Sequence, residues 1–362
     1  MHQYTYITSK TLFLNSPYTE DIWQRAVPEM AFSGKNYLVD AMLSVAALHL
    51  RSIRPEEKAL AHASHAYATS TLADFRANLG KGITADNAEA LFLTASLIAF
   101  QAVASRIFTK DDSERDANGV PSRYELPLPW FHAFQGVKTV VATSWMWIRD
   151  SAVCQAVIDA QPSLQIDLNP SAPNTFFGHL LEDIQVEMSN EASDRVAETT
   201  QAYFHAVCVL NWVHKSPYPA ATLAFAATVS RRYVDLLDEK RPRALAILAC
   251  FFGLLKRMDG VWWLKDVARR EVMGLVGMFE TGSKWWAHLE WPIRIALWDG
   301  GAMIPSDVWG TECDAEPVRD DGNVETMMSH IELITQLINP PRDKVATSMA
   351  YEEEELAPAS PD

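Results

Sequence analysis

Apolar positions are densest in residues 241–298, and the elements predicted there organise the rest of the chain. The run ALAILACFFGLL at residues 244–255 is almost unbroken, and Pro242 stands before it at a plausible first helical position. A helix that is apolar on every side must be enclosed by other helices. We therefore predict a buried central helix over residues 244–255.

Six of the twelve Trp residues lie in the same stretch. After a break at residues 259–260, Trp262 and Trp263 are predicted to open a second helix, and a third element near Trp285 is predicted to stop at Pro292. Because a Trp ring can line a large cleft while its N–H binds a partner, this cluster would suit an apolar ligand pocket. Ordinary packing between helices explains the same composition and is the simpler interpretation.

Elsewhere, apolar residues recur at intervals of three and four, and no window alternates convincingly with period two. This pattern, with sparse Gly and frequent Ala, Leu and Glu, favours an all-α fold: an irregular multi-helix bundle around the central helix. We expect one domain over residues 1–340 and a disordered acidic tail over residues 341–362. Further helices are predicted near residues 20–27, 36–50, 55–80, 86–104, 130–148, 176–213, 221–239 and 324–338, with loops at 110–129 and 161–174.

The formal net charge is −15, and the chain has no long block of Lys or Arg. Contacts with phosphates supply most of the affinity for nucleic acid, so this charge argues against direct binding of DNA or RNA. The four Cys residues are dozens of positions apart, which fits neither a zinc cluster nor a dense disulfide framework. Cys208 and Cys250 lie in apolar helical stretches typical of buried thiols. These features indicate a reducing intracellular compartment.

Residues 90–104 are the best candidate for a membrane span. They include Thr94, Ser96 and Gln101 and are shorter than the ~20 residues that a bilayer requires, so we predict a buried helix and no membrane span. The N-terminal sequence MHQYTY has neither the charged start nor the apolar core of a secretory signal. We therefore expect no export.

The His residues give only weak candidates for catalysis or metal binding. His62 and His65 lie one helical turn apart, but no third ligand accompanies them, and His205 and His214 lie on opposite sides of a continuous helix. His132, which follows a Pro-rich loop and two aromatic residues, is the weak catalytic candidate that would lie at a pocket mouth. No nucleophile elbow and no glycine-rich phosphate loop occur. We predict no metal site and no cofactor.

Two blocks of sequence carry a resemblance to a known family. The first is LVDAMLSVAALHL and its continuation to residue 100, and the second comprises RPRALAILA at 241–249, the Trp262-Trp263 pair and EWP at 290–292. In this order they resemble the regulatory domain of fungal binuclear zinc-cluster transcription factors of the sterol uptake control type. Those regulators also carry a short module in which six Cys bind two zinc ions, and this module docks in the DNA major groove. We expect this chain to lack that module, so zinc ligation and DNA reading are not implied for it.

The resemblance implies a helical receptor for a hydrophobic, sterol-like molecule, in the nucleus or cytoplasm. Because the zinc module is expected to be absent, we expect the chain to bind such a molecule or a partner regulator and to modulate transcription without touching DNA. A homodimer, or a heterodimer with related regulators, is a further candidate assembly. It identifies no pocket residue, so candidates for the pocket lining rest on aromatic placement alone. They are Phe92, Phe100, Phe252, Leu255, Trp262 and Trp263.

Two alternatives remain open. The first is an interaction protein that pairs with full-length relatives through the apolar stripe at residues 324–338, and the second is a biosynthetic enzyme or cyclisation chaperone. Met328→Asp and Ile331→Asp would test the first alternative, because association through the stripe could not survive them. The second alternative reuses the apolar cavity to fold a reactive substrate, and His132 would be the first residue to replace.

Overall fold

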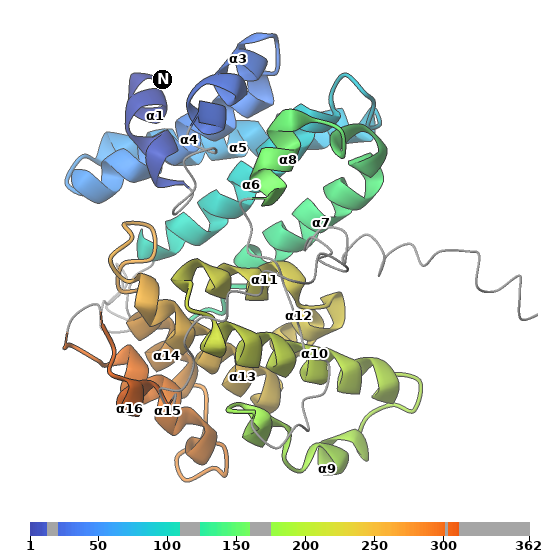
Figure 1. Ribbon diagram of the computed structural model, residues 1–362, viewed down its shortest axis with the longest axis vertical. Helices are drawn as coiled ribbons and strands as arrows, with labels where there is room; N and C mark the ends of the chain where they lie inside the picture. The colour runs from blue at the N-terminus through green and yellow to red at the C-terminus, as the bar shows by residue number, and fades with distance from the viewer. Residues whose placement is uncertain (13–20, 109–123, 160–174, 301–302, 311–362) are drawn as a thin grey trace, which may run out of the picture.

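The computed structural model describes residues 1–12, 21–108, 124–159, 175–300 and 303–310. These residues contain helices and no strand, which confirms the predicted all-α fold (Figure 1). Residues 110–123 of the loop predicted at 110–129, the loop predicted at 161–174, the stripe at 324–338 and the tail at 341–362 lie outside the described residues. The helix that follows the first of these loops begins at Leu128, two residues inside the predicted loop.

The helices vary widely in length, as expected for an irregular bundle. The α-helices are α1 (His2–Tyr6), α3 (Val27–Phe32), α4 (Asn36–Ile53), α5 (Lys58–Gly80), α6 (Ala88–Ala104), α7 (Leu128–Ile148), α8 (Ala152–Asp159), α9 (Ile184–Met188), α10 (Val196–Lys215), α11 (Ala224–Thr228), α12 (Arg231–Asp238), α13 (Pro242–Leu254), α14 (Val267–Val276), α15 (Trp286–Ala296) and α16 (Ser306–Trp309). Short 3-10 or π-helical turns are η1 (Thr8–Thr11), η2 (Ile22–Ala26), η3 (Ser105–Phe108), η4 (Gly178–Leu181), η5 (Pro219–Leu223) and η6 (Leu255–Met258).

The buried central helix predicted from the apolar run is α13. Every residue from 243 to 254 is buried, and Pro242 occupies the first turn, where its missing N–H costs no helical hydrogen bond. α10, α12, α14 and α15 pack around it (Figure 1). This enclosure explains how a helix without a polar face is stable here. Cys208 in α10 and Cys250 in α13 are buried, as predicted.

α15 continues through Pro292, so the prediction that this proline stops the helix is wrong. A proline inside a helix removes one backbone hydrogen bond and crowds the preceding turn. Here α15 lies very close to α13: a Cβ placed on Gly253 would be 3.0 Å from the Trp291 ring and 3.3 Å from the Cα of Pro292. Close packing on a glycine of the central helix therefore outweighs the local preference of the proline.

Buried apolar side chains form two clusters. The central cluster surrounds α13, and the N-terminal cluster is built mainly from α4 and the first part of α6. α6 and α7 contribute to both, since Leu97 and Val140 lie in the N-terminal cluster whereas Val103 and Trp130 lie in the central one. In Figure 1 this packed pair of helices accordingly runs between the N-terminal helices and those around α13.

One described segment, Ala88–Phe108, is long and apolar enough to cross a membrane when only length and composition are considered. It comprises α6 and η3, and half of its most apolar window is buried. A core helix passes the same test, so the finding is weak evidence for a span. The buried helix predicted at residues 90–104 is confirmed, because α6 contributes side chains to both clusters.

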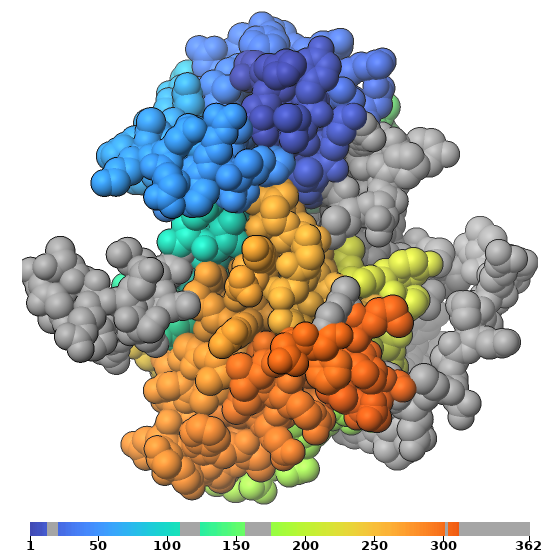
Figure 2. Space-filling view, turned by 90° about the vertical axis from the view of Figure 1, so that its left-hand side faces the viewer, coloured from blue at the N-terminus to red at the C-terminus, as the bar shows by residue number. Residues whose placement is uncertain are grey.

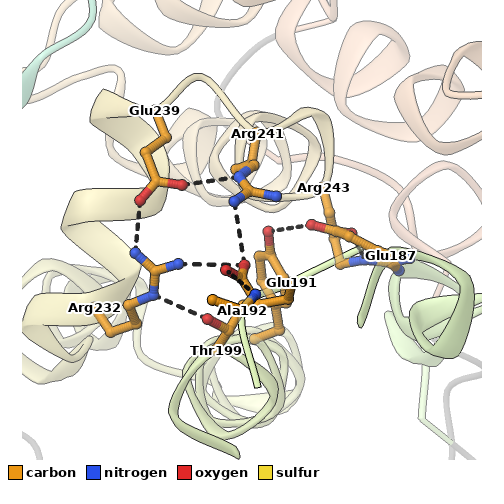
Figure 3. A network of polar contacts seen from close by, with 9 residues as sticks. Glu187, Glu191, Ala192, Thr199, Arg232, Glu239, Arg241 and Arg243 are labelled. Carbon is orange, nitrogen blue, oxygen red and sulfur yellow. Dashed lines mark hydrogen bonds and ion pairs between the residues drawn. The ribbon is translucent and has the colours of Figure 1, made fainter. Parts of the chain in front are cut away.

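Charged side chains attach α12 and the start of α13 to the segment that follows α9 (Figure 3). Arg232 and Arg241 both donate to the carboxylate of Glu191, at 3.4 and 3.1 Å, and both donate to Glu239, at 2.6 and 2.8 Å. Arg232 Nε also donates to the Thr199 hydroxyl of α10 at 2.9 Å. Because the Arg232 and Glu191 side chains are each only 5% exposed, each needs the other to balance its buried charge.

A second buried carboxylate attaches α14 to η3, directly after α6. Glu271 is fully buried and accepts hydrogen bonds from Arg106 Nε and Nη2 at 2.9 and 2.7 Å, from the Tyr124 hydroxyl at 2.8 Å and from Arg270 at 3.0 Å. Burial and this carboxylate raise the pKa of Tyr124 well above its usual value. The Tyr124 ring lies against Gly274 of α14, where an added Cβ would be 2.6 Å from the ring carbon Cγ. Only glycine leaves room for the ring at this position.

Candidate functional site at the tryptophan junction

Trp262 and Trp263 lie in the loop between η6 and α14, so the prediction that they open a helix is wrong. α14 begins at Val267, after Asp266 adopts a left-handed backbone conformation with a φ of 59°. The carboxylate of Asp259 closes the loop by accepting a hydrogen bond from the backbone N–H of Asp266 at 2.8 Å. Such side-chain-to-backbone bonds offer the chain an alternative to helix, which the pattern of apolar residues did not reveal.

Both indole rings bind the N-terminal segment. Trp262 Nε1 donates to Thr11 Oγ1 at 2.9 Å, and Trp263 Nε1 donates to the Thr11 carbonyl oxygen at 3.2 Å. His49 of α4 stacks on Trp262 with ring centroids 4.5 Å apart and planes inclined by 9°. Its Nδ1 lies 3.0 Å from the Oγ1 of Thr8. Two tryptophans of the central region therefore hold η1 and α4 in place.

Phe100 of α6 contacts both tryptophans. Its ring centroid is 6.2 Å from that of Trp262 and 5.0 Å from that of Trp263, in edge-on geometry, and its side chain packs against both apolar clusters. In Figure 2 the blue N-terminal residues accordingly rest on the orange part of the chain. We call this set the tryptophan junction: Thr8, Thr11, His49, Phe100, Trp262 and Trp263.

The junction combines flat apolar rings with a few polar atoms. Burial lowers the pKa of His49, so its imidazole is neutral near pH 7 and has one donor and one acceptor nitrogen. Trp263 is buried, whereas Trp262 is half-buried and reaches the surface. The junction thus combines flat apolar rings with one indole N–H at its half-buried edge, and the Thr11 hydroxyl accepts that N–H in the structure.

The other three candidate lining residues lie away from the junction. Phe252 packs in the central cluster, edge-on to Trp130 with centroids 5.7 Å apart, and Leu255 belongs to the same cluster. Phe92 belongs to the N-terminal cluster. The structure thus brings half of the six candidates together, and a ligand-binding role for any of them stays a prediction.

The His candidates are distributed over three helices, α5, α7 and α10. His132 is exposed on α7, and none of the hydrogen bonds, ion pairs or ring contacts described for the structure involves it, so its catalytic role stays a prediction. His62 and His65 are exposed on α5. Across the part of the chain that the structure describes, no three His, Cys, Asp or Glu side chains are gathered to hold a metal ion. α10 is continuous, so His205 and His214 lie on opposite sides of it, as predicted.

An aromatic box around His214 was not expected from the sequence. The imidazole stacks between Phe176 and Trp309, with centroids 4.2 and 5.2 Å away. Its Nε2 lies 3.1 Å from the Trp309 carbonyl oxygen, which also accepts from Trp291 Nε1 at 2.9 Å. Burial lowers the pKa of His214 to about 4. A side chain of the protein itself fills this box, so ordinary packing explains Trp291, as the simpler interpretation of the Trp-rich stretch expects.

Comparison with known proteins identifies relatives among fungal regulators. No family model matches the chain. The chain is 64% identical over 341 residues to a Zn(2)-C6 fungal-type transcription factor of Gibberella zeae, a match that covers 94% of this chain and 69% of that protein. It is 25% identical over 251 residues to the Zn(2)-C6 fungal-type transcription factor afumD of Aspergillus fumigatus, covering 68% of this chain and 63% of the relative.

A more distant relative is Sterol uptake control protein 2 of Candida albicans, which is 22% identical over 293 residues, covering 74% of this chain and 38% of the relative. The chain therefore spans between 38% and 69% of the length of these three proteins. The 64% identity extends over nearly all of the chain, from the N-terminal helices to the central cluster. The chain belongs to the family of Zn(2)-C6 fungal-type transcription factors.

Proposed function

We propose that this chain is a regulatory domain that binds a hydrophobic small molecule of the sterol class and thereby modulates transcription. Membership of a transcription factor family supports the regulatory role. The name of the Candida albicans relative, Sterol uptake control protein 2, suggests the class of ligand. The observation that carries the proposal is the tryptophan junction, where flat aromatic rings and an indole N–H connect the two apolar clusters.

Ligand binding at the junction has a direct structural consequence. A sterol hydroxyl that accepts the Trp262 N–H takes the place of the Thr11 hydroxyl, now 2.9 Å away, while the Phe100 and His49 rings contact the flat skeleton. Thr11 then loses a partner, and η1 is released from the loop before α14. The ligand would therefore alter how the N-terminal helices sit on the central cluster, which a partner protein could detect.

The proposal assigns no DNA contact to this domain. Its net charge of −15 opposes binding to a phosphate backbone, and binding to a partner regulator would bring it to a promoter instead. On this proposal the protein acts in the nucleus or moves between nucleus and cytoplasm, as its family membership suggests.

Native mass spectrometry of the purified chain after incubation with a lipid extract tests the proposal. We expect one retained sterol-class molecule, released unchanged. Trp262→Ala should lower the bound fraction at least tenfold, whereas Trp286→Phe, at the exposed start of α15, should bind like the wild type. Equal retention by both variants, or no retained molecule, would refute the proposed site. A retained molecule converted to a new mass would indicate an enzyme, and a stable dimer without ligand would indicate an interaction protein.

A further inference from the structure

Two histidines far apart in the sequence point their rings at one another. Nδ1 of His179, in η4, lies 2.8 Å from Nδ1 of His288, in α15. The ring centroids are 5.1 Å apart and the planes differ by only 5°. A centroid separation this large with so short a nitrogen contact means that the rings meet edge to edge in nearly one plane. Both side chains are half-buried, so the nitrogens are held in place yet lie close to solvent.

The two Nδ1 atoms share a hydrogen bond in the structure, and the same two atoms could also bind one metal ion. A divalent metal such as zinc binds imidazole nitrogen at ~2.0–2.1 Å, which sets two nitrogens of a tetrahedral site ~3.3 Å apart. To reach that spacing His179 and His288 need to separate by about 0.5 Å, and both rings need to turn so that the nitrogens, which now face one another along the N–N line, converge on the metal. The one Nδ1 proton of the neutral pair moves to the Nε2 of its own ring, so that both Nδ1 lone pairs face the metal.

The charged groups that act on His288 are two carboxylates, Glu182 and Asp183, and two cations, Arg243 and Lys284. The cations that face His288 are already paired: Arg243 with Glu187 at 2.8 Å, and Lys284 with Asp183 at 3.8 Å.

Glu182 is an acidic group whose charge acts on both imidazoles. It is exposed, directly after η4, and no hydrogen bond or ion pair of its carboxylate occurs among the described residues. Its negative charge is therefore available to a bound cation, either directly or through a water molecule.

We propose that His179 and His288 form a binding site for a divalent transition metal that prefers imidazole, such as Zn²⁺. Water completes the coordination, because no third His, Cys, Asp or Glu ligand is gathered with the pair among the described residues, and the exposed Glu182 carboxylate adds a negative charge that acts on both imidazoles. The site joins η4 to α15, and both pack on α13. Metal binding therefore clamps two elements on one side of the central helix, and it requires no ligand at the tryptophan junction.

Titration of the metal-free 362-residue protein with Zn²⁺ in a calorimeter tests the site. We expect one site with a micromolar dissociation constant, a rise in melting temperature with Zn²⁺, and neither effect with Mg²⁺, which prefers oxygen ligands. His288→Asn keeps a hydrogen-bonding atom near the position of Nδ1, so the fold should persist while Zn²⁺ affinity falls at least tenfold. His179→Asn should do the same, and Glu182→Gln should weaken binding several-fold.

The matched control is an exposed His pair elsewhere in the chain. His62 and His65 are exposed one turn apart on α5, and the double variant His62→Gln/His65→Gln should bind Zn²⁺ like the wild type. Circular dichroism confirms that each variant is folded. The proposal is overturned if the wild type shows no heat of binding, if the His179 and His288 variants keep the wild-type affinity, or if the control variant loses it.

Discussion

Two glycine-to-alanine substitutions in helices should have opposite effects on stability. Gly136 is exposed in α7, and an added Cβ there meets nothing within 4 Å. Because Ala favours a helix interior over Gly, Gly136→Ala should stabilise the protein by about 0.8–1 kcal/mol. Gly274 lies in α14 with the same intrinsic preference, but its Cβ would be 2.6 Å from Cγ of the Tyr124 ring.

The contacts of the Tyr124 ring set the loss of stability expected for Gly274→Ala. Non-bonded carbon atoms pack best when they are ~3.5–4.0 Å apart, so the Tyr124 ring must move by about 1 Å or more. Tyr124 then loses its 2.8 Å bond to the Glu271 carboxylate, which is worth about 1.5–3 kcal/mol for a charged acceptor. Overpacking adds about 1–3 kcal/mol. After the helix-forming gain of Ala is subtracted, we expect Gly274→Ala to destabilise the protein by roughly 2–5 kcal/mol.

Urea unfolding, followed by the circular dichroism of the helices, measures the change in free energy of unfolding for both variants, provided that its slope with urea concentration is the same as in the wild type. Repeating Gly274→Ala in a Tyr124→Ala background removes the ring, so the loss should disappear there and the helix-forming gain should return. If Gly274→Ala is as stable as Gly136→Ala, or if it destabilises equally without the Tyr124 ring, the close approach described here is wrong.

Three further substitutions test other contacts. Glu191→Gln removes the negative charge between Arg232 and Arg241, so we expect the free energy of unfolding measured with urea to fall by about 3–5 kcal/mol. A change below about 1 kcal/mol would contradict the network. Trp262→Phe keeps a smaller aromatic ring but deletes the N–H that binds Thr11, for which a loss of at least about 1 kcal/mol is expected, and no loss would mean that the bond is not formed. His214 binds its proton only below about pH 4 in the folded protein but near 6.5 when unfolded. The wild type should therefore lose stability as pH falls from 6.5 to 4, and His214→Gln should weaken that dependence by up to ~1.4 kcal/mol per pH unit; identical profiles would refute it.

The elements governed by local composition could be predicted from the sequence. α13 follows from one almost unbroken apolar run after a proline, and α5 ends at Gly80 as expected. Its start at Lys58 is later than the predicted position at Pro55, because a turn in which the Glu57 N–H binds the Arg54 carbonyl comes first. Helix boundaries set by such single hydrogen bonds leave no trace in the apolar pattern.

The candidate site was predicted only in part. Aromatic placement singled out Phe100, Trp262 and Trp263, which do meet. Their polar partners were not found, because Thr11 lies 251 positions from Trp262 and no spacing rule connects them. The His179 and His288 pair, 109 positions apart, was missed for the same reason. Contacts between distant segments depend on how the helices pack, and a single sequence records that only indirectly.

The sharing of α6 and α7 between the two apolar clusters has a consequence for cooperativity. Neither cluster can loosen without disturbing helices that the other also uses, so the two should unfold in one transition and their amide protons should exchange together. A molecule that binds at the edge of the N-terminal cluster would then stabilise α13 as well. Binding would then be transmitted as a change in the stability of both clusters, without a displacement of any helix.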